Sequence, residues 1–124
     1  MLVIANAFSI GMLPTEECAV RFRKVSPEEA RKMAEGDEAV WSVIRHPATR
    51  DIAFDCLRLT PDRVIKIPTV TLNRGMNMLV FMPVWRGGRP PETREYTAEE
   101  MRELAESVEI WHVQLVWNLE TRKQ

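Results

Sequence analysis

His46 is the residue of this sequence best placed for acid–base chemistry. It lies directly before Pro47, which suits the first position of a helix, and Arg45 and Thr49 flank it. Backbone N–H groups and the dipole at a helix N-terminus favour anions, so these residues can form a small phosphate site that contains an acid–base group. A histidine that only caps the helix at the surface is the simpler alternative, and the residues alone leave both open.

A second candidate is the loop "RGGRPPET", residues 86–93. Arg86 and Arg89, with Arg94 just after the loop, form a local positive cluster that contains Glu92, and two adjacent glycines provide a hinge. A mobile basic loop over a cavity suits an anionic ligand. A solvated hairpin tip explains the same composition.

The third candidate is "ANAFSIGMLP", residues 5–14, which follows a short apolar run. Asn6 and Ser9 can donate hydrogen bonds at the end of a strand, where α/β sheets often place their ligands. A polar turn that closes around a buried Phe8 is the alternative, and the sequence does not separate the two.

Other chemistry-bearing residues have simpler explanations. His112 alternates with apolar residues on a predicted strand, which indicates a core or interface position. Asp51 and Asp55 have no histidine partners at metal-ligand spacing, so we expect no metal site. Cys18 and Cys56 lack such spacing too and are interpreted as buried free thiols. No Walker loop, dinucleotide fingerprint or nucleophile elbow is present, and no cofactor is expected.

Length and charge narrow the class of protein. The 124 residues fit a single domain, and the net charge of −1 gives no reason to expect binding to DNA or to a membrane surface. No apolar run approaches the roughly 20 residues of a membrane span. No basic segment precedes the first apolar run, so a signal peptide is not expected and the predicted location is the cytoplasm.

Hydrophobic periodicity and helix-start signals predict the elements that position these residues. "SPEE" at 26–29 and "TAEE" at 97–100 carry capping signals, and the segment 39–45 is undecided between strand and helix. The predicted strands are 2–5, 18–25, 64–67, 78–84 and 108–117, and the predicted helices are 27–36, 47–57 and 98–107. Their irregular alternation predicts an α/β or α+β domain over residues 1–124, with one mixed sheet of about five strands flanked by helices. The last strand is apolar on both faces, which favours a central place in the sheet.

The three candidate segments also match one family in order. The chain resembles the viral ring nucleases that act as type III anti-CRISPR proteins, a family that also occurs in phages and bacteria. Its motifs "ANAFS-[apolar]-N-M-L", "I-G-H-x-[ST]-T" and "R-L-x-E-G" correspond here to residues 5–13, 44–49 and 89–93. The order and spacing extend over nearly the whole chain, and the first motif is the most specific.

The resemblance implies a homodimer that binds cyclic tetra-adenylate, the second messenger of type III CRISPR defence. It implies metal-independent cleavage of the ring to linear di-adenylates that end in a 2′,3′-cyclic phosphate, in the host cytoplasm if the protein is viral. The catalytic histidine of the family falls on His46 and its supporting glutamate on Glu92. The candidate substrate-binding residues are Asn6, Phe8, Ser9, Gly11, Arg45, Thr49, Arg86 and Arg89.

The chain departs from the family at several motif positions. Gly11 replaces an asparagine, Arg45 replaces a glycine, and Pro90 and Thr93 replace a leucine and a glycine. The differences at Gly11 and Arg45 leave open a non-catalytic binder of cyclic oligonucleotides that acts as a sponge or sensor. A protein-interaction module that binds no nucleotide is a third function that the sequence leaves open.

Overall fold

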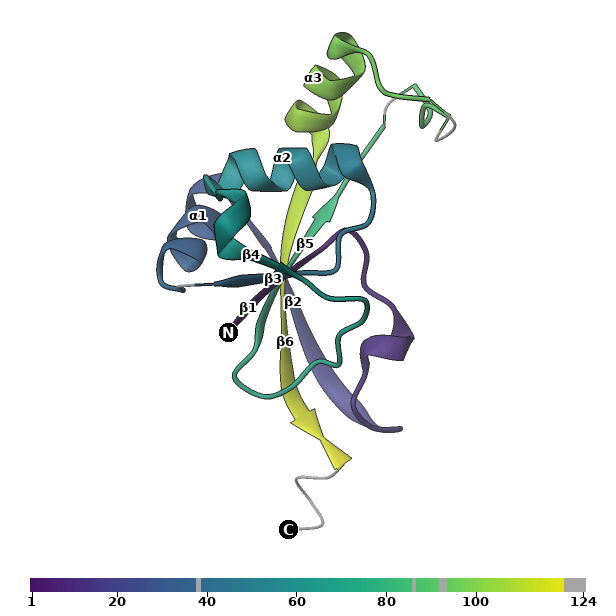
Figure 1. The fold of residues 1–124 in the computed structure, drawn as a ribbon. Helices are drawn as coiled ribbons and strands as arrows, with labels where there is room; N and C mark the ends of the chain where they lie inside the picture. Colours follow the sequence, from purple (N-terminus) through teal and green to yellow (C-terminus); the bar gives the residue numbers. More distant parts are fainter. Residues whose placement is uncertain (38, 86, 92–93, 120–124) are drawn as a thin grey trace.

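The computed structural model describes residues 1–37, 39–85, 87–91 and 94–119. It has one six-stranded mixed sheet and three α-helices (Figure 1). The strands are β1 (Leu2–Ala5), β2 (Cys18–Val25), β3 (Val40–Ser42), β4 (Val64–Lys66), β5 (Asn77–Met82) and β6 (Glu109–Asn118). The helices are α1 (Pro27–Glu35), α2 (Pro47–Leu57) and α3 (Ala98–Ser107), with 3₁₀ turns at Ile10–Met12 and Pro61–Arg63. The mixed α+β class is confirmed, with six strands where about five were predicted.

The strand order is β2-β6-β5-β1-β3-β4. β1 pairs in parallel with β3 and β5, and β3 pairs in parallel with β4. β6 runs antiparallel between β5 and β2, so it is an interior strand, as its apolar faces predicted. The extra strand is β3, a three-residue strand within the segment 39–45 that the sequence left undecided between strand and helix.

The two faces of the sheet are covered differently. One face packs against α1 and α2 around a core that contains Leu2, Ile4 and Phe81. On the other face, Val3, Ala5 and other side chains pack mainly against loop residues, and Figure 1 shows loops and a short 3₁₀ turn on this side but no α-helix. The near-complete burial of β1 on both faces explains its uninterrupted apolar sequence.

The helix starts follow the predicted capping residues. Ser26 accepts from the N–H of Glu29 at 3.1 Å, and Thr97 and Glu100 form a full capping box at the start of α3. The carboxylate of Glu29 does not close a box, because Arg23 on the neighbouring strand binds it at 2.9 Å. A charged donor within reach is a stronger partner for a carboxylate than a neutral backbone N–H.

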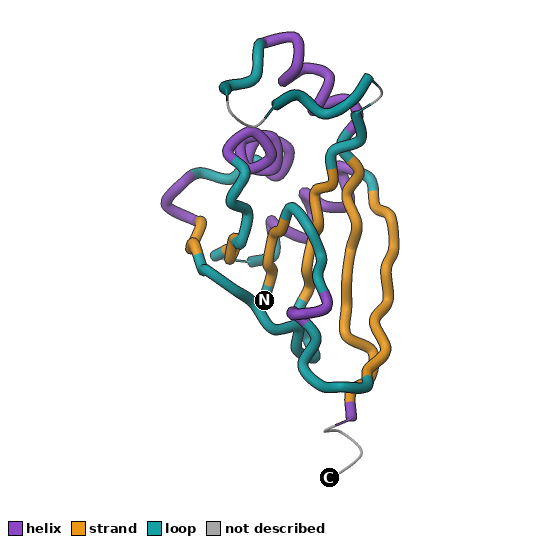
Figure 2. The backbone as a smooth tube through the Cα atoms, turned by 90° about the vertical axis from the view of Figure 1, so that its right-hand side faces the viewer, coloured by secondary structure: helices purple, strands orange, loops and turns teal. Residues whose placement is uncertain are grey.

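The parallel strands direct the three candidate segments to one edge of the sheet. β1, β3 and β5 all end there, and each is followed by one of the segments singled out above. In Figure 2, α3 lies beyond the ends of the long strands at this same edge. The edge is therefore where functional side chains from distant parts of the sequence can meet.

None of the helices in the described residues combines the length and the apolar character that a membrane span requires.

Candidate functional site

His46 is the N-cap of α2, at the carboxyl edge of the sheet. Its backbone is extended, and Pro47 occupies the first helical position, as the sequence predicted. The imidazole Nδ1 accepts from the N–H of Thr49 at 3.3 Å and lies 2.9 Å from the Thr49 hydroxyl oxygen. The cap therefore fixes the orientation of the ring.

The other nitrogen of His46 meets a tyrosine that lies 50 residues further along the chain. Tyr96 Oη is 3.1 Å from His46 Nε2, and the two rings are tilted with centroids 5.3 Å apart. The Thr49 N–H can only donate, so Nδ1 accepts and a neutral ring carries its proton on Nε2. In that tautomer Nε2–H donates to the oxygen of Tyr96.

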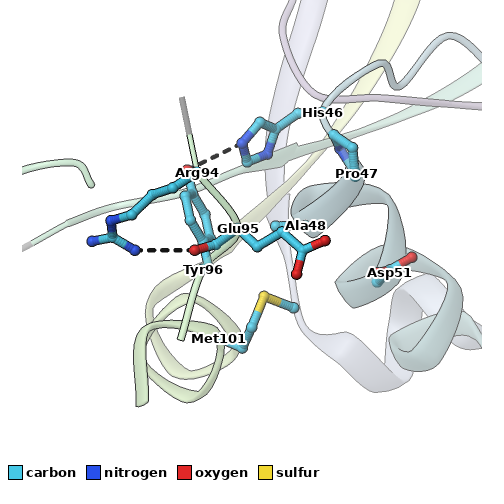
Figure 3. Close-up of a pocket in the computed structure, with 8 residues that line it drawn as sticks. All are labelled: His46, Pro47, Ala48, Asp51, Arg94, Glu95, Tyr96 and Met101. Atoms are coloured by element: carbon cyan, nitrogen blue, oxygen red, sulfur yellow. Dashed lines mark hydrogen bonds between the residues drawn. The ribbon is translucent and has the colours of Figure 1, made fainter. Parts of the chain in front are cut away.

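These groups border a cavity of about 610 Å³ between the start of α2 and the start of α3. Figure 3 shows His46 and Tyr96 with the other residues of its wall. Those residues are Pro47, Ala48 and Asp51 from α2, Arg94 and Glu95 from the segment before α3, and Met101 from α3. A volume of this size suits one part of a nucleotide ligand.

The charges at the cavity are mixed. Arg94 binds both carboxylate oxygens of Glu100, at 2.7 and 2.9 Å, and donates to the Glu95 carbonyl at 3.1 Å. The hydrogen bonds from Arg94 are the main reason why the pKa of Glu100 falls to about 2. Arg94 is thus oriented by Glu100, while Asp51 and Glu95 add carboxylates to the wall.

The first turn of α2 offers one further donor. Pro47 has no N–H, the N–H of Thr49 caps onto His46, and that of Arg50 bonds to the His46 carbonyl at 3.0 Å. The N–H of Ala48, at the wall of the cavity, therefore has no partner within the helix. A phosphate oxygen is a suitable acceptor at this position.

The two residues predicted beside His46 have different surroundings. Thr49 is 1% exposed and lies beneath the imidazole, so its hydroxyl supports His46. Arg45 is exposed, and its guanidinium donates to the Pro68 carbonyl at 2.9 Å. Arg45 thereby ties the start of α2 to the loop after β4.

Asn6 and Phe8 border a second cavity, of about 560 Å³, on the loop-covered face of the sheet. Its wall is mainly apolar and includes Phe22, Met82 and Trp111. The rings of Phe8 and Phe22 meet edge to face, with centroids 5.3 Å apart. The structure thus divides the predicted residues between two cavities at one edge of the sheet.

The remaining predicted residues are less enclosed. Ser9 is exposed at the start of the 3₁₀ turn, and Gly11 lies within it. A Cβ at Gly11 would come no closer than 3.7 Å to the Ser9 hydroxyl, so a larger residue would fit there. Arg89 is exposed, and Arg86 and Glu92 lie outside the described residues.

His112 is a buried histidine of the core, as its place among apolar residues predicted. Its Nε2 bonds Asn77 Oδ1 at 2.9 Å. Burial lowers the pKa of His112, and the nearby Arg23 and Arg21 lower it further, against a smaller opposite effect of Glu29. The folded protein therefore favours the neutral ring.

This shift predicts loss of stability in weak acid. The unfolded chain binds a proton at His112 below a pH of about 6.5, where the folded chain resists it. The free energy of unfolding should be highest above that pH and should fall as the pH decreases through it. Urea unfolding between pH 8 and pH 5 measures the slope, and His112→Gln, which does not titrate, should flatten it. An unchanged slope in the variant would assign the effect to other groups.

Comparison with known proteins bears on the fold. No protein-family model and no curated protein sequence matches the chain. Among solved structures, B116 of Sulfolobus turreted icosahedral virus is similar, with a TM-score of 0.65 and 19% sequence identity. The match covers 91% of this chain and 97% of that protein. This likeness shows the fold. It extends over nearly the whole chain.

Tyr96 and Glu95 were not predicted from the sequence as residues of the His46 cavity, and Arg94 was predicted only as part of the positive cluster at the basic loop. The one signal for Tyr96 was its place directly before the capping threonine of α3, at the end of the basic loop.

In the described part of the chain, no group of three or more histidine, cysteine, aspartate or glutamate side chains could hold a metal ion.

Proposed function

We propose that the protein is a ring nuclease that cleaves cyclic tetra-adenylate into linear di-adenylates with a 2′,3′-cyclic phosphate. The observation that carries the proposal is the position of His46: it caps α2 at the wall of a cavity, beside an N–H that suits a phosphate. The ordered match of the three sequence motifs and the place of their segments at one sheet edge support it.

The chemistry needs few groups from the protein. RNA carries its own nucleophile, because the 2′-hydroxyl can attack the adjacent phosphorus when it is held in line with the departing 5′ oxygen. His46 is the source of the proton that this 5′ oxygen needs. The Ala48 N–H and Arg94 stabilise charge on the phosphate.

The proton of the 2′-hydroxyl also needs an acceptor. Glu95 brings a carboxylate to the wall of the cavity, and Figure 3 shows its side chain directed towards Ala48 and Asp51. We assign this task to Glu95 among the described residues, while Glu92 keeps the supporting role that the family resemblance implies. No metal ion takes part in these steps.

A ring of four nucleotides is larger than one cavity, which favours a dimer. Two copies related by a two-fold axis would present two His46 sites to a ligand of matching symmetry. The exposed Phe22 and Met82, on the loop-covered face, supply apolar surface for such a contact. We therefore propose a homodimer as the active form.

The test is incubation with cyclic tri-, tetra- and hexa-adenylate in EDTA, followed by chromatography and mass determination. We expect the tetra-adenylate to be converted to di-adenylate with a cyclic phosphate, and the rate to be unaffected by the chelator. Activity that is lost in EDTA and restored by a divalent ion would overturn the mechanism.

Two other outcomes point to the alternative functions. Tight binding of an intact ring would identify a sponge or sensor. The absence of any thermal shift with all three rings would favour a protein-interaction module.

A further inference from the structure

Neither imidazole nitrogen of His46 is directly available to a ligand. Nδ1 is held by the N–H and hydroxyl of Thr49, and Nε2 is held by the hydroxyl of Tyr96. A leaving oxygen that took its proton directly from Nε2 would have to occupy the place of the Tyr96 oxygen. Tyr96 is itself one of the residues that line the cavity.

Contacts within the folded structure position Tyr96 beside His46. Its ring packs edge to face against Trp85, with centroids 5.6 Å apart, and contacts the ring of His46 on another side. The next residue, Thr97, is the N-cap of α3 and takes part in a capping box with Glu100. Ring packing and the capped helix start together restrict both the side chain and its backbone.

The hydroxyl of Tyr96 has the right hydrogen-bonding capacity to pass a proton on. Its oxygen accepts from Nε2–H of His46, which leaves its own O–H for a group in the cavity. The Thr49 hydroxyl, 2.9 Å from Nδ1, can accept from that nitrogen when the ring is protonated and donate to it when the ring is neutral. When Nδ1 carries a proton it donates to this hydroxyl, and the N–H of Thr49 then loses its acceptor on the ring.

We infer that Tyr96 delivers the proton to the leaving 5′ oxygen and that His46 resupplies it, an inference that rests on the proposed function. As the 2′ oxygen bonds to phosphorus, it gives its proton to Glu95. The P–O5′ bond breaks and its electron pair stays on O5′, which takes the proton of the Tyr96 hydroxyl. The imidazolium of His46 passes its Nε2 proton to the Tyr96 oxygen and becomes neutral. Tyrosine is unchanged at the end of the step.

Replacing the leaving 5′ oxygen by sulfur tests whether Tyr96 donates a proton to it, independently of any structural damage caused by the substitution. In a cyclic tetra-adenylate whose scissile 5′ oxygens are replaced by sulfur, a thiolate departs, and a thiol with a pKa of about 8.5 needs no proton donor to leave. Tyr96→Phe should slow single-turnover cleavage of the oxygen ring by about 10²-fold or more. The same variant should cleave the sulfur ring at close to the wild-type rate, and His46→Ala should show the same pattern.

Ser107→Ala is the control, since it also removes one hydroxyl, a buried one for which the described residues provide no hydrogen-bond partner. It should cleave both rings like the wild type. Equal slowing of both rings by Tyr96→Phe, or no slowing of the oxygen ring, would overturn the role of Tyr96 and leave the ring-nuclease proposal standing. A wild-type protein that cleaves neither ring would remove the proposed function and this inference together.

Discussion

Replacement of His46 by alanine is expected to slow single-turnover cleavage of cyclic tetra-adenylate by about 10²- to 10⁴-fold. In the proposed mechanism, the variant loses the source of the proton for the leaving oxygen. It retains the Ala48 N–H and Arg94 at the cavity wall, so affinity for the ring should change much less than the rate. Rapid quench at saturating protein gives the rate, and titration of a non-cleavable ring gives the affinity.

A second substitution separates catalysis from helix capping. Asparagine is a favourable N-cap residue whose side-chain oxygen can accept from the N–H of Thr49, as Nδ1 of His46 does now. His46→Asn should therefore retain the melting temperature and still lose the activity. His112→Gln, a change at the other histidine, should keep the wild-type rate. Wild-type turnover in His46→Asn would show that the histidine only caps the helix, and the site assignment would have to be abandoned.

The second large effect concerns the core that supports α2. Phe81 is 0% exposed on β5 and packs in the cluster between the sheet and the two helices. Phe81→Ala should lower the free energy of unfolding by about 3–5 kcal/mol, because it removes a large apolar side chain and leaves a cavity. That is a large fraction of the ~5–15 kcal/mol by which domains are stable, and urea unfolding measures it.

Met82 provides the matched control. It is the next residue of the same strand, but its side chain lies towards the opposite face and is 41% exposed. Met82→Ala should cost much less than Phe81→Ala. Similar losses for the two variants would mean that the helix-covered face does not dominate stability.

Local signals predicted the helices well, because their determinants lie within a few residues. Ser26 and Thr97 both cap the helices that their sequences indicate, and His46 and Pro47 begin α2 as predicted. The contact between Glu29 and Arg23 was not predictable in this way, since it depends on how α1 packs beside β2. Capping patterns describe one segment and carry no information about competing partners from another.

In the candidate site too, adjacent residues predicted some features, while others depend on contacts between distant elements. The place of His46 at a helix start followed from adjacent residues, whereas its contact with Tyr96 required α2 and α3 to pack together. Asn6 and Phe8 were expected to share a ligand with His46, and they lie at the same sheet edge but border the second cavity. Strand-end patterns predict the edge, and side-chain packing decides which face of the sheet each residue reaches.

The two helices that border the His46 cavity, α2 and α3, differ in how readily they unfold locally. α2 buries three residues, two of them in the core cluster against the sheet, whereas α3 buries one, Leu104. Segments with little buried apolar surface open at a free-energy cost below that of the whole domain. Undocking of α3 would carry the adjoining Tyr96 away from His46 while the sheet stayed folded. Assembly of the His46–Tyr96 pair is thus a separate equilibrium from folding, and a ligand that contacts both sides of the cavity would shift it towards the assembled form.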